Sequence, residues 1–92
     1  MANVTIKLLI VYNGNNMTAK YIVYDYAIYI FPPHVNHADF ARRNRFKHEE
    51  INGAGFIVCD DSISCFGESV SLKVTSRNKE DTLIAKRMLR GY

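Results

Sequence analysis

The chain has 92 residues, of which 48% are hydrophobic and 23% charged, and these values are close to globular averages. They exclude a disordered, coiled-coil or collagen-like chain, and the length predicts a single domain over residues 1–92. Twelve basic residues against nine acidic ones give a net charge of +3, a modest excess that favours an anionic partner without indicating nucleic acid.

The number and spacing of the cysteines and the N-terminal sequence indicate the cellular compartment. Cys59 and Cys65 are too few for the disulfide framework of a small secreted domain, and they are not spaced as a Cys-x-x-Cys pair. The N-terminal residues lack the basic region and cleavage site of a signal peptide. The longest apolar-looking stretch, 21–31, is interrupted by Asp25 and is too short to span a bilayer. We therefore expect a cytoplasmic protein with no membrane segment.

Apolar and β-branched residues predict two strands in the first third of the chain. The segment Val4–Tyr12 alternates at first, with Thr5 and Lys7 on one side, and then becomes apolar on both sides, which is typical of a central strand. Asn13-Gly14 predicts a hairpin turn, because both residues tolerate positive φ. Its partner strand is Lys20–Phe31, which is dense in tyrosine, isoleucine and valine, and Pro32-Pro33 ends it.

A short helix and a loop are expected next. Asn36 is a candidate N-cap, and the segment from His37 to about Phe46 has weak helical spacing with Phe40 as its main apolar anchor. The run Asn52-Gly53-Ala54-Gly55 predicts a loop.

A second hairpin follows that loop. Phe56–Cys59 and Ile63–Phe66 are apolar segments on either side of the turn residues 60–62. After a bulge or kink at Gly67-Glu68, the alternation over Ser69–Val74 predicts a further half-buried strand.

The last element is a helix capped by Ser76 or Asn78. Glu80 and Asp81 fall in its first turn and basic residues in its last, so charges complement the helix dipole at both ends. Its apolar stripe is expected to pack on the sheet and comprises Ile84, Ala85, Met88 and Leu89. Together the elements predict an α+β fold: a mixed or antiparallel sheet of about five strands, one short helix and one C-terminal helix.

Two groups of polar residues could form a binding site, for a metal ion in one case and for nucleic acid in the other. The histidines and cysteines lack the spacing of a zinc site, so we interpret them as exposed imidazoles and small hydrophobic thiols and expect neither metal nor cofactor; they are His34, His37, His48, Cys59 and Cys65. A basic cluster comprises Arg42, Arg43, Arg45 and Lys47. It has few neighbouring aromatic residues and no known nucleic-acid motif, so nucleic-acid binding is not favoured.

Three separate segments resemble one enzyme family. They are His37-Ala38-Asp39-Phe40 at a helix start, Gly53-Ala54-Gly55 before a strand, and Cys65 to Val70 after the next strand. In order and rough spacing they resemble the Janus-type phosphohistidine phosphatases. In that small α+β family a His-Ala-Asp-aromatic segment carries the catalytic histidine, a glycine triplet precedes a strand, and an aromatic-Gly-x-Ser-Met turn contacts phosphate. Lys7 falls where the family has a functional lysine on its first strand.

The resemblance implies a small, metal-independent phosphatase-like or phosphoryl-binding protein. Its ligand would be a phosphorylated protein or another small anion. His37 would be the catalytic base toward water, and the phosphate-binding residues would be Lys7, Gly67, Ser69 and Val70.

The chain also departs from the family pattern. Ala54 replaces the middle glycine, Phe56 stands where the family has arginine, and Ser71-Leu72-Lys73 replaces alanine, tyrosine and glycine. Glu68 brings a negative charge beside the implied phosphate site.

Other interpretations of the same residues stay open. His37 is also compatible with an ordinary exposed position at the start of a helix, and Gly67 and Ser69 with a bulge between strands. The alternative function is a non-catalytic protein-binding accessory module of bacterial or phage origin. The tyrosines between positions 12 and 29 favour that alternative, and a homodimer through them is one form of it.

Overall fold

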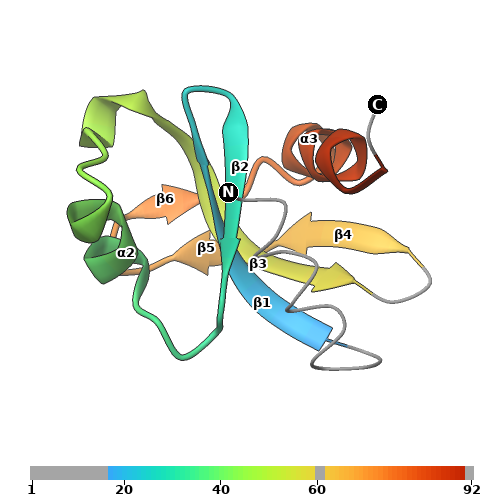
Figure 1. Cartoon of the computed structure of the whole chain (residues 1–92), viewed down its shortest axis with the longest axis horizontal. Helices are drawn as coiled ribbons and strands as arrows, with labels where there is room; N and C mark the ends of the chain where they lie inside the picture. The colour runs from blue at the N-terminus through green and yellow to red at the C-terminus, as the bar shows by residue number, and fades with distance from the viewer. Residues whose placement is uncertain (1–16, 60–61, 91–92) are drawn as a thin grey trace.

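The computed structural model describes residues 17–59 and 62–90, and Figure 1 shows how their elements are arranged. The elements in chain order are β1 (Met17–Tyr24), β2 (Ala27–Phe31), α2 (His37–Arg43), a 3-10 turn η1 (His48–Glu50), β3 (Ile51–Cys59), β4 (Ile63–Phe66), β5 (Glu68–Ser69), β6 (Val74–Thr75) and α3 (Lys79–Arg90). The predicted strand Val4–Tyr12 and its turn at Asn13-Gly14 lie outside the described residues.

The segment predicted as one strand, Lys20–Phe31, is a hairpin instead. Strands β1 and β2 pair antiparallel, with Tyr24 opposite Ala27. The two residues between them, Asp25 and Tyr26, have φ values of 51° and 66°, so they form the kind of two-residue turn whose twist suits a hairpin. The prediction was wrong because neither residue is a glycine or asparagine, the usual markers of this turn. The predicted end of the strand at Pro32-Pro33 is confirmed, since β2 stops at Phe31.

The described residues form a main sheet of four antiparallel strands in the order β2-β1-β3-β4, and β5 and β6 form a separate two-stranded ribbon. With the two α-helices of the described residues, this arrangement confirms the predicted α+β class, although the described strands form two sheets of four and two strands and not one sheet of about five. The run Asn52 to Gly55, predicted as a loop, lies inside β3 and pairs with β1. The register shifts between Val23 and Tyr24, which leaves Asn52 as the extra residue of a β-bulge. The predicted pairing of Phe56–Cys59 with Ile63–Phe66 is confirmed.

Both faces of the sheet are covered. Helix α3 lies on one face, while α2 and the β5-β6 ribbon lie on the other (Figure 1). The core on the α3 side is made of residues such as Tyr21, Ile57 and Ala85, and the core on the α2 side of residues such as Ile22, Phe31 and Ala54. Adjacent residues of β1 therefore serve opposite cores, because side chains alternate along a strand.

The ribbon replaces a predicted strand. Ser69–Val74 was expected to be a continuous strand, but it forms a turn between β5 and β6, with Lys73 at φ 60°. The kink predicted at Gly67 is present, and its φ of 80° is one that glycine adopts without strain.

Helix α3 follows the prediction closely. The Ser76 hydroxyl accepts a hydrogen bond from Asn78 N–H at 3.0 Å just before the helix begins. All four residues of the predicted stripe belong to or pack against the core on that face: Ile84, Ala85, Met88 and Leu89. None of the helices formed by the described residues has the length and apolar character that crossing a bilayer requires.

Candidate functional site

His37 opens helix α2 and is buried. Asn36 has extended backbone geometry, and its Oδ1 accepts hydrogen bonds from the N–H groups of Ala38 and Asp39, so it is the N-cap that the sequence predicted. The His37 side chain is only 4% exposed. Its ring makes edge contacts with Phe31 and Phe56 at centroid distances of 5.5 and 6.0 Å. The alternative interpretation of His37 as an ordinary exposed helix-start residue is therefore wrong.

The hydrogen bonding of His37 defines its neutral form. Its Nε2 lies 2.9 Å from the backbone oxygen of Gly55. A carbonyl oxygen only accepts, so Nε2–H donates, and a neutral ring then presents Nδ1 as its acceptor nitrogen. Burial lowers the pKa of His37, and the nearby Lys20 charge lowers it further, against the opposing effect of hydrogen bonding to the backbone of Gly55 and Tyr21. The imidazole is consequently neutral at pH 7.

An open cavity of about 410 Å³ lies beside His37. Its walls come from β1, the start of α2, β3 and the segment that joins β4 to the ribbon turn. The lining residues are Lys20, Asn36, His37, Phe56, Phe66, Gly67, Glu68, Val70 and Ser71. Three of the five residues named in the sequence analysis, His37, Gly67 and Val70, thus line one cavity although they are far apart in sequence.

The other two predicted site residues have different outcomes. Lys7 lies outside the described residues, and Ser69 is not among the lining residues. Ser69 is buried, and its hydroxyl accepts from Leu72 N–H at 3.1 Å, so this side chain shapes the turn. Ser71 lines the cavity in its place, and its hydroxyl accepts from Ala38 N–H at 3.1 Å.

The lysine of the cavity is Lys20. Its Nζ donates to the Val35 oxygen at 2.9 Å, which ties β1 to the loop before α2. Sequence reasoning missed Lys20 because it counted this residue as one position of a long strand. The alternation of β1 contains the signal: Lys20 shares a face with Ile22 and Tyr24, which both pack on the α2 side.

The glycines of β3 have a packing explanation. A Cβ at Gly53 would overlap the Asp81 carboxylate, and one at Gly55 would lie 2.5 Å from the Phe66 backbone oxygen. The missing side chain at Gly53 therefore leaves room for the Asp81 carboxylate on one face of β3. The same segment contains the Gly55 backbone oxygen that accepts the hydrogen bond from His37.

The carboxylate over Gly53 belongs to a buried polar network that the sequence analysis did not foresee. Asp81 lies in the first turn of α3 as predicted, and it is fully buried. It accepts from the Tyr21 hydroxyl at 2.6 Å and from Arg77 N–H and Nε–H at 2.9 Å each, and Arg77 Nη2 completes an ion pair at 2.7 Å. Burial and the Asp81 carboxylate raise the pKa of Tyr21 well above its usual range, so the phenol stays protonated and donates.

The described residues do not support two other kinds of site, a metal site and a cysteine nucleophile. Among the described residues, no three histidine, cysteine or acidic side chains are close enough together to hold a metal ion. Burial raises the pKa of Cys65 to about 12, which removes the thiolate needed for nucleophilic attack.

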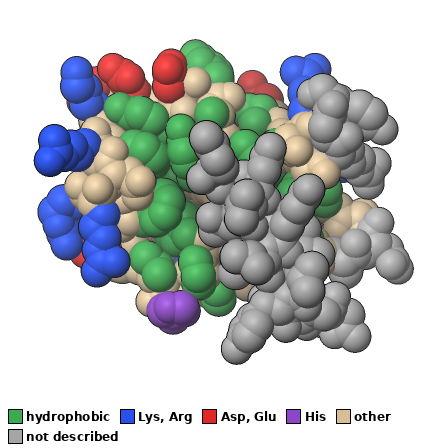
Figure 2. Space-filling model, viewed as in Figure 1, with side chains coloured by type: hydrophobic (Ala, Val, Ile, Leu, Met, Phe, Trp, Pro, Cys, Tyr) green, Lys and Arg blue, Asp and Glu red, His purple; other side chains and the backbone are tan. Residues whose placement is uncertain are grey.

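The basic cluster lies on the surface. Arg42, Arg43, Arg45 and Lys47 are all exposed. Figure 2 shows Lys and Arg side chains gathered on the side of the molecule where α2 lies in Figure 1. Arg42 pairs with Asp39 at 2.9 Å. Single exposed pairs of this kind contribute little to stability.

Comparisons with protein-family models, with curated proteins and with solved structures found no match to this chain. The resemblance to the Janus-type phosphatases therefore rests on the residues described above and stays a prediction.

Proposed function

We propose that this chain binds a phosphoryl group in the His37 cavity and acts as a small, metal-independent phosphatase. The observation that supports the proposal is the shared cavity: His37, Gly67 and Val70, all named on sequence grounds, line it together with the cation of Lys20. A phosphorylated protein side chain is the proposed substrate. The cavity is open, so a side chain carried on another molecule can enter it.

His37 has the protonation state that a general base needs. It is neutral at pH 7 because burial lowers its pKa, and its Nε2–H is engaged by Gly55. In the proposed step Nδ1 takes a proton from a water molecule while the water oxygen attacks phosphorus and the bond to the leaving group breaks. The Gly55 contact fixes the ring orientation.

The phosphoryl oxygens need donors and positive charge. Lys20 supplies the charge. Within the part of the chain that the structure describes, the N–H groups of Val70 and Ser71 donate to no other group, and they are the proposed donors. Glu68 opposes an anion in the same cavity, so we expect Glu68→Gln to tighten the binding of inorganic phosphate.

Turnover of a phosphohistidine peptide tests the proposal. Wild-type protein is expected to release phosphate, His37→Ala is expected to lose the activity with its circular dichroism spectrum unchanged, and the exposed His34→Ala is the matched control. Lys20→Met is expected to weaken phosphate binding, while Lys47→Met on the surface is not. No turnover by wild type, or equal turnover by His37→Ala, contradicts the catalytic proposal.

A second candidate is a non-catalytic protein-binding module. It is favoured by Phe66 and Val70, which are 41% and 78% exposed although they are apolar, and which both line the cavity. Binding of a phosphorylated protein without its hydrolysis supports this candidate. The double variant Phe66→Ser with Val70→Ser is then expected to lose that binding. For either function we propose a cytoplasmic location, on the sequence grounds given above.

A further inference from the structure

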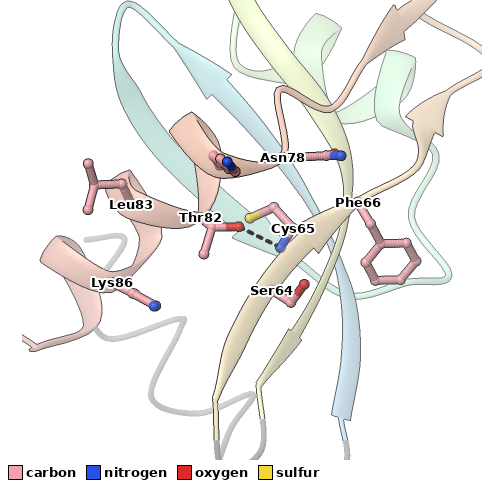
Figure 3. Close-up of a pocket in the computed structure, with 8 residues that line it drawn as sticks. Ser64, Cys65, Phe66, Asn78, Thr82, Leu83 and Lys86 are labelled. Atoms are coloured by element: carbon pink, nitrogen blue, oxygen red, sulfur yellow. Dashed lines mark hydrogen bonds between the residues drawn. The ribbon is translucent and has the colours of Figure 1, made fainter.

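A second cavity of about 410 Å³ lies between α3 and β4, and Figure 3 shows the side chains around it. Helix α3 contributes Lys79, Thr82, Leu83 and Lys86 to its wall. These residues are spaced i, i+3, i+4 and i+7, so they form one face of the helix. That face is distinct from the apolar stripe that packs on the core. We call this cavity the α3-β4 groove.

The groove runs beside the outer strand of the sheet, but that strand is not open to simple strand addition. Among the strands that the structure describes, β4 pairs with β3 alone. Its Cys65 N–H donates to the Thr82 hydroxyl at 2.9 Å, the dashed line in Figure 3. Thr82 thus occupies a backbone donor that an added strand would need. An occupant of the groove must be held mainly by side chains.

The charge of the groove is positive. Lys79 and Lys86 both line it; among the described residues no acidic side chain lines the groove, and neither lysine forms an ion pair. Between them along the helix lies Leu83, which is 51% exposed. These two lysines, on either side of an exposed leucine, are complementary to an apolar side chain flanked by carboxylates.

We propose that the α3-β4 groove binds an extended acidic segment of a partner protein. Lys86 is seven positions after Lys79 along the helix, a rise of roughly 10 Å. In an extended chain, carboxylates four residues apart are roughly 13 Å apart on the same face, with one side chain between them. The flexible lysine side chains compensate for the difference between these two distances, and the peptide side chain between the two carboxylates contacts Leu83. This proposal does not depend on phosphatase activity in the His37 cavity.

Fluorescence anisotropy with a labelled peptide containing Glu-Thr-Leu-Thr-Glu tests the proposal. Wild-type protein is expected to bind it, and the double variant Lys79→Glu with Lys86→Glu to bind at least about tenfold more weakly. The matched control is Arg43→Glu with Lys47→Glu, which makes the same charge change at exposed positions near α2, and it is expected to retain most of the affinity. A peptide with lysines in place of the glutamates is expected to prefer the Lys79/Lys86 double variant over wild type.

Four results overturn the proposal. They are no binding of the acidic peptide by wild type, an equal loss in both double variants, no charge-swap preference, and tighter binding of a labelled single-stranded oligonucleotide through the same two lysines. The last result would indicate general polyanion binding. Circular dichroism of each variant verifies that the fold is intact, and the charge-swap peptide keeps the test informative where affinity falls for another reason.

Discussion

At the scale of single residues, the absence of a side chain at Gly53 determines how α3 sits on the sheet. The Asp81 carboxylate occupies the space where a Cβ would project, and from there it accepts hydrogen bonds from both Tyr21 and Arg77. A buried carboxylate is stable only when such partners surround it. The glycine in β3 and the aspartate in α3 are therefore two halves of one packing arrangement.

Replacing Gly53 with alanine is expected to destabilise the fold by about 3 kcal/mol, because the added methyl group displaces a buried and hydrogen-bonded carboxylate. Urea unfolding measures the change, with the exposed β1 substitution Thr18→Ala as the control. In an Asp81→Ser background the same glycine substitution is expected to cost much less, because the overlap is gone. Equal costs in the two backgrounds would place the effect elsewhere.

His37 is expected to make stability depend on pH. Its pKa is lowered in the folded chain, so the unfolded chain binds more protons and stability falls as pH drops from about 7 through the unfolded pKa near 6.5. One such group contributes at most about 1.4 kcal/mol per pH unit. The replacement His37→Gln should flatten this part of the profile in urea titrations at pH 7.5, 6.5 and 5.5. The exposed His34→Gln should leave it unchanged, and an unchanged profile for His37→Gln would refute the assignment.

The sequence contained part of the candidate site but not its full membership. His37, Gly67 and Val70 were recognisable because they belong to segments whose order and rough spacing resemble those of the Janus-type phosphatases. The alternation of β1 indicates the face on which Lys20 lies, but that Lys20 and Ser71 reach the same cavity depends on strand register and on the turn that follows β5. The burial of Asp81 was hidden for the same reason: an acidic residue in the first turn of a helix is normally explained by the helix dipole alone.

At the scale of elements, local sequence signals were sufficient to predict an element where its apolar periodicity and its capping residues agreed. Helix α3 has both, and its stripe packs as expected. The β1-β2 hairpin has no such signal, because its turn is Asp25-Tyr26. A tyrosine at positive φ is uncommon, so only the pairing of the two strands across the sheet explains why the chain reverses there.

The hairpin turn is expected to be a place where stability can be gained. Tyr26 is 69% exposed and has a φ of 66°, so its ring contributes little packing while its Cβ is strained. Tyr26→Gly is expected to raise the free energy of unfolding by about 1 kcal/mol, measured by urea denaturation. Tyr26→Ala retains the Cβ and is the control. A gain of equal size for alanine would show that the ring, and not the backbone angle, was the cause.

At the scale of the whole molecule, stability and candidate function are divided between different layers. Strands β1 and β3 have neighbours on both sides and core packing on both faces. The His37 cavity also has walls from these strands, but the rest of its wall is the first turn of a seven-residue helix and a turn between two strands of two residues each. Segments with so few buried contacts open more readily than central strands do.

Amide hydrogen exchange is expected to follow this division. Amides of β1 and β3 should exchange slowest, near the rate set by global unfolding, and those of residues 68–75 should exchange much faster. Because the proposed phosphoryl donors lie in that turn, added inorganic phosphate should slow exchange over residues 67–71 and leave α3 unaffected. The Lys20→Met variant should lose the phosphate-dependent protection while keeping slow exchange in β3. Uniform slowing over all peptides, or protection that survives in Lys20→Met, would mean that the anion stabilises the chain without occupying the cavity.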